Sequence, residues 1–310
     1  MKLRLLLLTF LLLLSVFVAA CAPVAAPPAA GSPPLTEYTN PDALVDTAWV
    51  QEHLADPNVR LLAISGKRED YDAGHLTNAI YVNLSEDMTN PQDSTRGQIL
   101  TQDALSALMS RLGVANEDTV VVYDNSNNLL AARAYWALKY YQHADVRLYN
   151  GGTKKWTADG NALSTEAPAA LPATTYVAGE ADPAIRTTSE YVLSKLDDSS
   201  VVLCDARNAE EFAGTDVRSA RGGHIPGAIN IDWVQAVNGE TGTFREAAAL
   251  QALYEKAGFA KDKEIITYCQ TGVRGAHTWF VLTQLLGYPN VRNYDGSWEE
   301  WGNDAAKPIE

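Results

Sequence analysis

The second half of the chain repeats the first half, and this repeat limits the possible folds more than any other feature. The matched segments are 70–80 with 221–229, 120–124 with 265–269, 146–152 with 291–297, and Trp156 with Trp301. From residue 120 to residue 156 the matches share a single offset of 145 residues, which chance rarely produces. The 310-residue chain therefore contains two copies of one unit, and each copy is expected to form a domain.

Each copy alternates short apolar segments with longer segments of helical character. The segments 201–204 and 264–268 are apolar on both faces, which is typical of parallel strands covered by helices on both sides. The predicted helices are 101–112, 130–141, 246–257 and 274–286. Gly113, Gly258 and Gly287 follow three of them, where a left-handed C-cap is favoured. The pattern predicts an α/β fold with two tandem domains, each a mainly parallel β-sheet flanked by helices.

The N-terminal segment has the features of an export signal. A short basic start and the apolar run Leu5–Val18 identify residues 1–20 as a signal peptide, and the run is short for a membrane-spanning helix. Cys21 follows two alanines, which resembles a bacterial lipobox, in which this cysteine becomes lipid-modified. The alternative is an ordinary signal peptide that is cleaved nearby. We expect an extracytoplasmic lipoprotein anchored to a membrane of a bacterial cell envelope.

Composition sets the other boundaries. Residues 21–36 contain the lipidated cysteine and an Ala/Pro-rich tether, whose composition cannot bury a core. Residues 37–163 are expected to form the N-terminal domain and residues 183–310 the C-terminal domain. The segment 164–182, rich in Ala, Pro and Thr, is the predicted linker.

Charge and cysteine content narrow the classes of partner. The net charge is −14, and removal of Lys2 and Arg4 with the signal peptide makes the mature chain more acidic. Such a chain argues against nucleic acid and anionic lipid surfaces as partners. The predicted domains hold two cysteines, so no disulfide framework is implied. Cys204 lies in an apolar strand and is interpreted as a core residue. Two packed copies in one chain favour a monomer.

Cys269 is the candidate nucleophile. It directly follows the predicted strand 264–268, and ligands gather at the carboxyl ends of parallel strands. The loop 270–274 contains a glycine and leads into a helix, so its backbone N–H groups are expected to bind anions and to favour thiolate over thiol. Arg274 is placed at the mouth of this loop. The alternative is a cysteine that ends a buried strand, with Arg274 on the surface of the helix.

Three segments resemble the signatures of one family. Tyr268–Arg274 resembles the active-site loop of the rhodaneses, or thiosulfate sulfurtransferases. Phe212 with Gly223–Asn230 resembles the N-terminal signature of the family, and Val291–Trp301 resembles its C-terminal signature. The resemblance implies that Cys269 takes the sulfane sulfur of thiosulfate as a persulfide and passes it to cyanide or a thiol. It implies ping-pong kinetics, with no metal or organic cofactor.

The candidate site residues follow from the loop and the resemblance. Cys269 is expected to be catalytic. Residues expected to bind the substrate are Gln270, Thr271, Gly272, Val273, Arg274 and Arg207. Residues expected to support the site are Asp205, His277 and Trp298. For Arg207 two roles stay open: it holds the donor, or it fixes the site through an ion pair with Asp205. His277 is expected to be packed or hydrogen-bonded, and Trp298 is first of all core material.

The first copy lacks the cysteine. Asp124 stands where Cys269 stands in the second copy, and a carboxylate cannot carry a persulfide. The N-terminal domain is therefore predicted to be inactive, to pack against the other domain and to wall its cleft. Asp124 is also a candidate cap for the helix that follows. His224 is interpreted as structural, because His75 has the same place in a copy without a catalytic cysteine.

Two departures from the family pattern leave the identity of the sulfur donor undecided. Related enzymes often carry an arginine near Glu211, and some thiosulfate enzymes carry a lysine at the position of Thr271, so Arg274 is the candidate replacement as anion clamp. The alternatives are a 3-mercaptopyruvate sulfurtransferase, a non-enzymatic persulfide carrier or sensor, and a phosphatase. Phosphatases of this fold resemble one another in having five residues between cysteine and arginine, whereas four separate Cys269 from Arg274 here.

Overall fold

The computed structural model describes residues 33–310. The predicted signal peptide, Cys21 and most of the predicted tether lie outside the described residues. Within 33–310, no helix is both long enough and apolar enough to cross a membrane.

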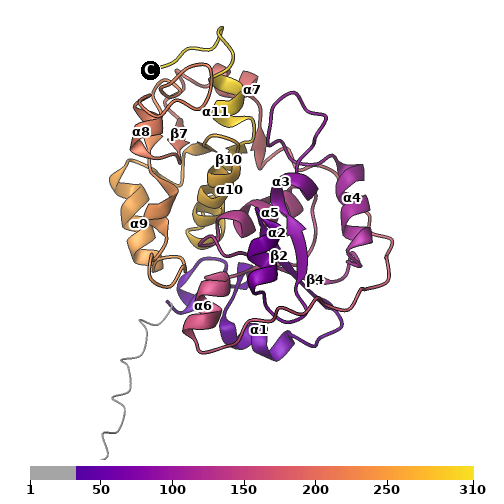
Figure 1. Cartoon of the computed structure of the whole chain (residues 1–310). Helices are drawn as coiled ribbons and strands as arrows, with labels where there is room; N and C mark the ends of the chain where they lie inside the picture. The colour runs from indigo at the N-terminus through magenta and orange to yellow at the C-terminus, as the bar shows by residue number, and fades with distance from the viewer. Residues whose placement is uncertain (1–32) are drawn as a thin grey trace, which may run out of the picture.

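The N-terminal domain is built on a five-stranded parallel sheet with the strand order β1-β5-β4-β2-β3. Its strands are β1 (Leu44–Val45), β2 (Val59–Ser65), β3 (Ile80–Asn83), β4 (Thr119–Tyr123) and β5 (Val146–Tyr149). Its helices are α1 (Thr47–His53), α2 (Arg68–Ala73), α3 (Leu84–Asp87), α4 (Gln102–Arg111), α5 (Leu129–Tyr140) and α6 (Gly152–Ala158). Helices lie on both faces of the sheet (Figure 1), which explains why its central strands β2 and β4 are mostly apolar and buried.

The C-terminal domain repeats this arrangement with the strand order β6-β10-β9-β7-β8. Its strands are β6 (Arg186–Thr187), β7 (Val201–Asp205), β8 (Ile229–Asn230), β9 (Glu264–Tyr268) and β10 (Val291–Tyr294). Its helices are α7 (Ser189–Ser194), α8 (Ala209–Phe212), α9 (Ala247–Lys256), α10 (Val273–Phe280) and α11 (Ser297–Trp301). The prediction of two tandem α/β domains with parallel sheets is confirmed.

The predicted helix ends hold with one difference. Gly113, Gly258 and Gly287 all have positive φ, as a left-handed C-cap requires. The predicted helix 274–286 is, however, not one regular α-helix. Helix α10 ends at Phe280, and a π-helical turn, Val281–Leu285, continues it. Leu282 and Leu285 in this turn are buried, so the wider turn keeps the apolar side chains of the segment in the core.

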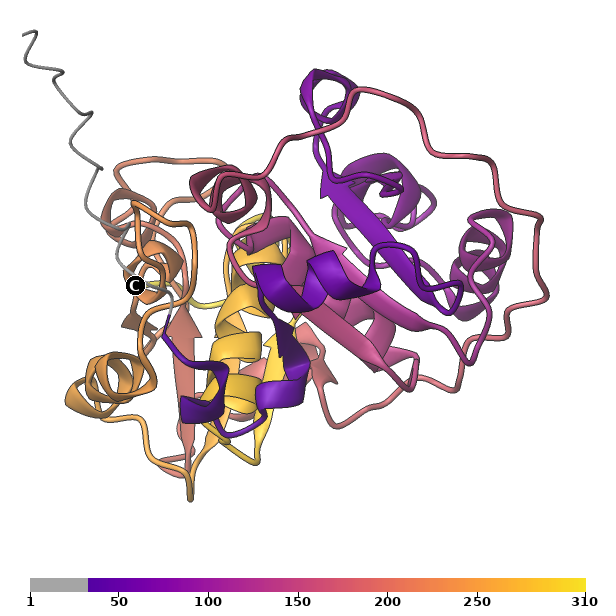
Figure 2. The ribbon, with the colours of Figure 1, turned by 90° about the horizontal axis from the view of Figure 1, so that it is seen from below.

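The two domains share one hydrophobic core, which includes buried residues of both. Helices α5 and α10, which are equivalent in the two copies, lie side by side at the centre of the molecule (Figures 1 and 2). The rings of Tyr135 and Phe280, residues at equivalent positions, meet edge to face across this contact with a centroid distance of 4.7 Å. The predicted packing of one domain against the other is confirmed.

Loops at equivalent positions cross reciprocally from each domain to the other. A β-carbon on Gly97 would lie 2.9 Å from the Cβ of Thr271, and one on Gly242 would lie 3.1 Å from the Oδ1 of Asn127. Two residues further along each loop, the N–H of Ile99 donates to Asp295 (3.2 Å), and the N–H of Phe244 donates to Asn150 (3.0 Å). Each domain thus covers the strand-end loop of its partner, which is the walling role predicted for the N-terminal copy.

Segments outside the two sheets also connect the domains. The Ala/Pro/Thr-rich stretch 164–182 contains no helix or strand, yet Tyr176 and Ala178 in it are buried. Before the chain enters the N-terminal domain, Thr39 and Asn40 donate backbone hydrogen bonds to carbonyls of the π-helical turn and Tyr38 Oη donates to the carbonyl of Arg245. Figure 2 shows this indigo segment beside the C-terminal domain. Residues 38–40 of the predicted N-terminal domain therefore lie on the C-terminal one.

Candidate active site

Cys269 lies at the carboxyl end of β9, the middle strand of the C-terminal sheet, and is 1% exposed. Asp205 ends the neighbouring strand β7 and Asp295 follows the strand on the other side, β10. Parallel strand order alone brings these three residues, which are far apart in sequence, to one edge of the sheet. The predicted location of Cys269 at a strand end, before the loop and α10, is confirmed.

Helix α11 holds the loop through backbone contacts. The N–H of Cys269 donates to Ser297 Oγ (3.1 Å), the N–H of Trp298 donates to the carbonyl of Cys269 (2.9 Å), and the N–H of Glu299 donates to the carbonyl of Gln270 (2.8 Å). Gly272 has φ +75°, and a β-carbon there would lie 2.8 Å from Asp295 Oδ1. This position therefore requires glycine, both for its backbone conformation and for space.

The same loop in the N-terminal domain holds a negative charge. The carboxylate of Asp124 accepts hydrogen bonds from the backbone N–H groups of Ser126 (2.9 Å), Asn128 (3.0 Å), Leu130 (2.7 Å) and Ala131 (2.9 Å). Burial raises the pKa of Asp124, and these four amides oppose that effect. Two of the donors belong to the first turn of α5, so the predicted helix-capping role of Asp124 is confirmed.

Equivalent positions define the corresponding loop around Cys269. With the offset of 145 residues, Ser126, Asn128 and Leu130 correspond to Thr271, Val273 and Gly275. Asn127 and Gly272, also equivalent, both have left-handed backbone conformations. The loop after Cys269 therefore corresponds to the one whose amides bind the Asp124 carboxylate, although the helix begins one equivalent residue earlier, at Val273. Amides in this arrangement stabilise a thiolate, or a terminal anionic sulfur attached to it.

Arg274 is paired with a buried acid. Its guanidinium donates to Glu211 at 2.5 and 2.9 Å, and Glu211 is 1% exposed. Burial lowers the pKa of Arg274, but the hydrogen bonds and charge of Glu211, together with the neighbouring Cys269, outweigh it and raise the pKa above its usual value. Burial raises the pKa of Glu211, but Arg274, Arg218 and Arg207 together lower it. Both partners are therefore charged at neutral pH.

Arg207 is fully enclosed. Its guanidinium donates to Asp205 (Nη2 to Oδ2, 2.6 Å) and to the carbonyl of Gly223 (2.8 Å), and it lies over the ring of Trp298 at 4.6 Å. Of the two roles expected for Arg207, this geometry favours fixing the site through Asp205 over holding the donor. Trp298 is 1% exposed and its indole N–H donates to the carbonyl of Arg221 (3.0 Å), so it is core material beside the loop.

The other predicted loop residues face protein. Gln270 Nε2 donates to Ser219 Oγ (2.9 Å) and to Glu299 (3.1 Å), which fixes the side chain against α11. Thr271 lies against Gly97 of the other domain, and Val273 packs against the shared core. Their contribution to anion binding therefore comes from backbone N–H groups.

The histidines and Cys204 have structural positions. His224 Nδ1 donates to the carbonyl of Phe212 (2.9 Å) and stacks on its ring, and His75 does the same with Tyr71. The structural interpretation of His224 is confirmed. Cys204 is fully buried in the core, as predicted.

His277 is completely buried behind the loop, against Trp233 and Phe244, and neither ring nitrogen has a hydrogen-bond partner among the described residues. Burial lowers the pKa of His277 to about 3, against about 6.5 in an unfolded chain. The unfolded state binds the proton more strongly, so stability is lost as pH falls from about 6.5 toward 3.

Replacing His277 with leucine is expected to remove this part of the acid sensitivity. Between pH 7 and pH 4.5, we expect the unfolding free energy of the native protein to fall by about 2–3 kcal/mol more than that of His277→Leu. Urea unfolding of both proteins at the two pH values measures this double difference. Parallel pH dependences would show that His277 is hydrogen-bonded or charged in the native state.

Arg133 of the N-terminal domain reaches the loop from the other side, and sequence analysis did not identify it. Its guanidinium donates to Asp295 (2.5 Å), to the carbonyl of Gly97 (2.9 Å) and to that of Gly272 (3.4 Å). Arg133 and Asp295 are 2% and 1% exposed. Ser297, whose Oγ accepts a hydrogen bond from the backbone N–H of Cys269, lies in the segment Val291–Trp301 that resembles a family signature, but no role was predicted for it. In the sequence, Arg133 is a basic residue within a largely apolar helix, and this pattern does not indicate a role in the site.

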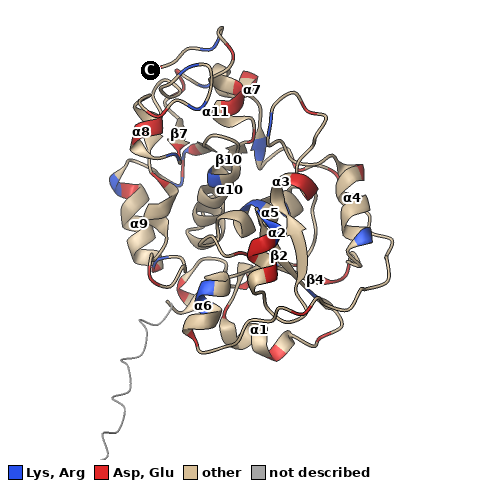
Figure 3. Ribbon diagram, viewed as in Figure 1, with Lys and Arg blue, Asp and Glu red and all other residues tan. Residues whose placement is uncertain are grey.

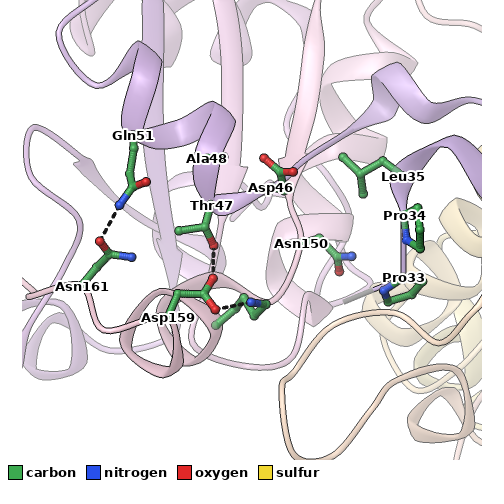
Figure 4. A pocket seen from close by; sticks show the side chains of 11 residues that line it. Pro33, Pro34, Leu35, Asp46, Thr47, Ala48, Gln51, Asn150, Asp159 and Asn161 are labelled. Atoms are coloured by element: carbon green, nitrogen blue, oxygen red, sulfur yellow. Dashed lines mark hydrogen bonds and ion pairs between the residues drawn. The ribbon is translucent and has the colours of Figure 1, made fainter. Parts of the chain in front are cut away.

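Cavities of the N-terminal domain lie away from Cys269. The space beside Asp124 measures about 20 Å³, room for about one water molecule. A larger cavity of about 410 Å³ lies where residues 33–35 meet α1 and α6. There Thr47 donates to Asp159 (2.5 Å) and Gln51 to Asn161 (2.6 Å) (Figure 4). Neither cavity includes a residue of the loop 269–274. Among residues 33–310, no group of three or more His, Cys, Asp or Glu side chains is arranged to hold a metal ion.

The fold and the loop define a class of tandem α/β proteins in which one domain holds a cysteine in an anion-binding loop and the other holds an aspartate. The rhodanese-like domain family matches residues 46–159 and again residues 188–304. The chain therefore belongs to the rhodanese family of sulfurtransferases.

Individual relatives agree with this assignment. The chain is 43% identical to the sulfur carrier protein TtuD of Thermus thermophilus over 88% of this chain and 98% of that protein. It is 40% identical to a thiosulfate sulfurtransferase of Corynebacterium glutamicum over 90% of this chain and 93% of that protein. Among solved structures, it is similar to SseA of Escherichia coli, a 3-mercaptopyruvate sulfotransferase, with a TM-score of 0.73, 27% identity, and coverage of 83% of this chain and 98% of that one.

Proposed function

We propose that the protein is a thiosulfate sulfurtransferase that carries sulfane sulfur on Cys269 and delivers it to cyanide or a thiol. The observation that supports this most strongly is the pair of equivalent strand-end positions: four amides surround the carboxylate of Asp124, and Cys269 stands at the same position before the corresponding loop. The relative of Corynebacterium glutamicum that bears this activity in its name also favours thiosulfate as donor.

The chemistry has two steps. The Cys269 thiolate attacks the outer sulfur of thiosulfate, the S–S bond of the donor breaks, and sulfite leaves with the electron pair. A Cys269 persulfide remains, and its terminal charge occupies the place that the Asp124 carboxylate has in the other loop. An acceptor such as cyanide then takes the terminal sulfur as thiocyanate and regenerates the thiolate.

Initial-rate kinetics test the two-step route. With thiosulfate and cyanide both varied, we expect parallel double-reciprocal lines, because each substrate meets a different form of the enzyme. Lines that intersect would mean that both substrates bind together and would contradict a free persulfide enzyme. Assays with 3-mercaptopyruvate, and with a phosphate ester monitored for phosphate release, test the alternative donors and the phosphatase alternative.

A sulfur carrier is the second candidate function. It is favoured by the 43% identity to TtuD, whose name describes a sulfur carrier protein. Slow turnover with small acceptors, together with fast transfer from persulfidated Cys269 to a protein thiol, would favour this function over that of an enzyme for small acceptors.

We also propose that residues 1–20 are a signal peptide and that Cys21 is lipid-modified, so that the monomeric protein works outside the cytoplasm on a membrane. The first 36 residues lie outside both rhodanese-like repeats, and this favours a separate targeting role for them. Palmitate labelling of cells that express the native chain or Cys21→Ala tests this; equal labelling of the two would contradict it.

A further inference from the structure

The mouth of the Cys269 loop contains as much negative as positive charge. Arg274 is held by Glu211 through two hydrogen bonds, and Arg218 pairs with Asp216 (2.6 Å) while lying 3.7 Å from Glu211. Figure 3 shows the acidic helix α8, which contains Glu211, and the basic first turn of α10. The two arginines are thus balanced by two carboxylates.

Glu211 also occupies the donor groups that an anion would use. It bonds to both terminal nitrogens of Arg274, which are the atoms that form a two-pronged contact with a sulfonate or carboxylate. Because Glu211 is 1% exposed, a donor cannot displace it into water without disrupting the site. Arg274 therefore offers an incoming anion less than a full unit of uncompensated charge, and the end of its guanidinium that faces Glu211 is already bonded.

The charge of the donor consequently matters. Thiosulfate is a dianion that approaches a thiolate, and each extra negative charge near the site adds repulsion. We propose that Glu211 determines donor specificity, so that Cys269 prefers sulfane donors with one negative charge, such as organic thiosulfonates and persulfides, over the thiosulfate dianion. This inference rests on the proposed function, since it concerns the first half of the same reaction.

Two donors of similar size, which react by the same step but differ in charge, isolate the effect of donor charge on the rate. Methanethiosulfonate carries one negative charge, and thiosulfate carries two. In both cases the thiolate of Cys269 attacks the outer sulfur and the donor S–S bond breaks. The leaving group is methanesulfinate from the first donor and sulfite from the second, each departing with the electron pair. The persulfide is the same, so transfer to saturating cyanide gives thiocyanate from both.

The test compares kcat/KM for the two donors in the native protein and in Glu211→Gln. We expect the ratio of kcat/KM for thiosulfate to kcat/KM for methanethiosulfonate to rise about tenfold in Glu211→Gln, mainly through a lower KM for thiosulfate. This is the effect of removing one unit charge roughly 10 Å from the donor at an effective dielectric near 20. Glu211→Asp, which retains the charge, should leave the ratio nearly unchanged. An unchanged ratio in Glu211→Gln would overturn the inference.

A second variant keeps the test decisive if Glu211→Gln does not fold. Arg218→Gln removes an exposed positive charge near the same carboxylate and should lower the ratio severalfold; no change or a rise would overturn the inference. Failure of the proposed function looks different. If the native protein forms no thiocyanate from either donor, the sulfurtransferase proposal fails, whereas activity with both donors and a charge-independent ratio contradicts only the role of Glu211.

Discussion

Cys269→Ser is expected to lower kcat for thiocyanate formation by roughly 10⁴-fold or more, which is the scale on which enzymes lose activity with their nucleophile. The hydroxyl of serine stays protonated at neutral pH and cannot carry a sulfane sulfur, so neither half of the reaction proceeds. The backbone should be undisturbed, because the contacts that hold the loop, such as the N–H of Cys269 to Ser297 Oγ, use main-chain atoms of this residue. Stopped assays of thiocyanate measure the effect.

Cys204→Ala is the matched control. Cys204 is the other cysteine of the described chain, and it lies fully buried one strand away, on β7. Its burial raises the pKa of the Cys204 thiol far above the usual range, so it has no thiolate at neutral pH. Cys204→Ala should retain activity, at the cost of a small loss in stability. If Cys204→Ala were inactive while Cys269→Ser worked, the assignment of the nucleophile would be wrong.

Arg133→Met is expected to destabilise the protein by about 3 kcal/mol, the lower end of the range for breaking a buried ion pair. Asp295 would lose one partner but keep Arg186 at 3.1 Å, which limits the loss. The carbonyl of Gly272 would lose a donor from the other domain, so the loop would shift and kcat would fall roughly 10- to 100-fold. Urea unfolding and thiocyanate assays measure the two effects.

Arg111→Met provides the comparison for Arg133→Met. Arg111 pairs with Asp87 at 3.1 Å, but its side chain is 64% exposed. Exposed pairs contribute less than about 1 kcal/mol, so this variant should keep its stability and its activity. Equal losses in Arg111→Met and Arg133→Met would show that the contact across the domain boundary has no special role.

The repeat made the fold predictable from sequence. A constant offset aligned β4 with β9 and α5 with α10. The strand and helix pattern of one copy, which is weak by itself, was therefore supported by the same pattern in the other copy. The loop at Cys269 was predictable for the same reason, because it lies on one continuous strand–turn–helix segment. Local sequence is sufficient for such features, since hydrogen bonds between near neighbours decide them.

Contacts between distant segments were not predictable. Arg133 and Asp295 are 162 residues apart, and their pairing depends on how the two domains pack. Glu211 was noted only as a departure from the family pattern. Its pairing with Arg274 depends on the strand order that places β7 beside β9. Both cases involve buried charges whose partners come from other elements, and neither propensity nor periodicity carries that information.

The central claim, that Cys269 carries the sulfur, is tested most directly by the intact mass of the protein after incubation with thiosulfate. We expect a gain of about 32 Da, one sulfur atom, in the native protein and in Cys204→Ala but not in Cys269→Ser, and cyanide should reverse it with release of thiocyanate. An unchanged mass of the native protein, or the same gain in Cys269→Ser, would contradict the account.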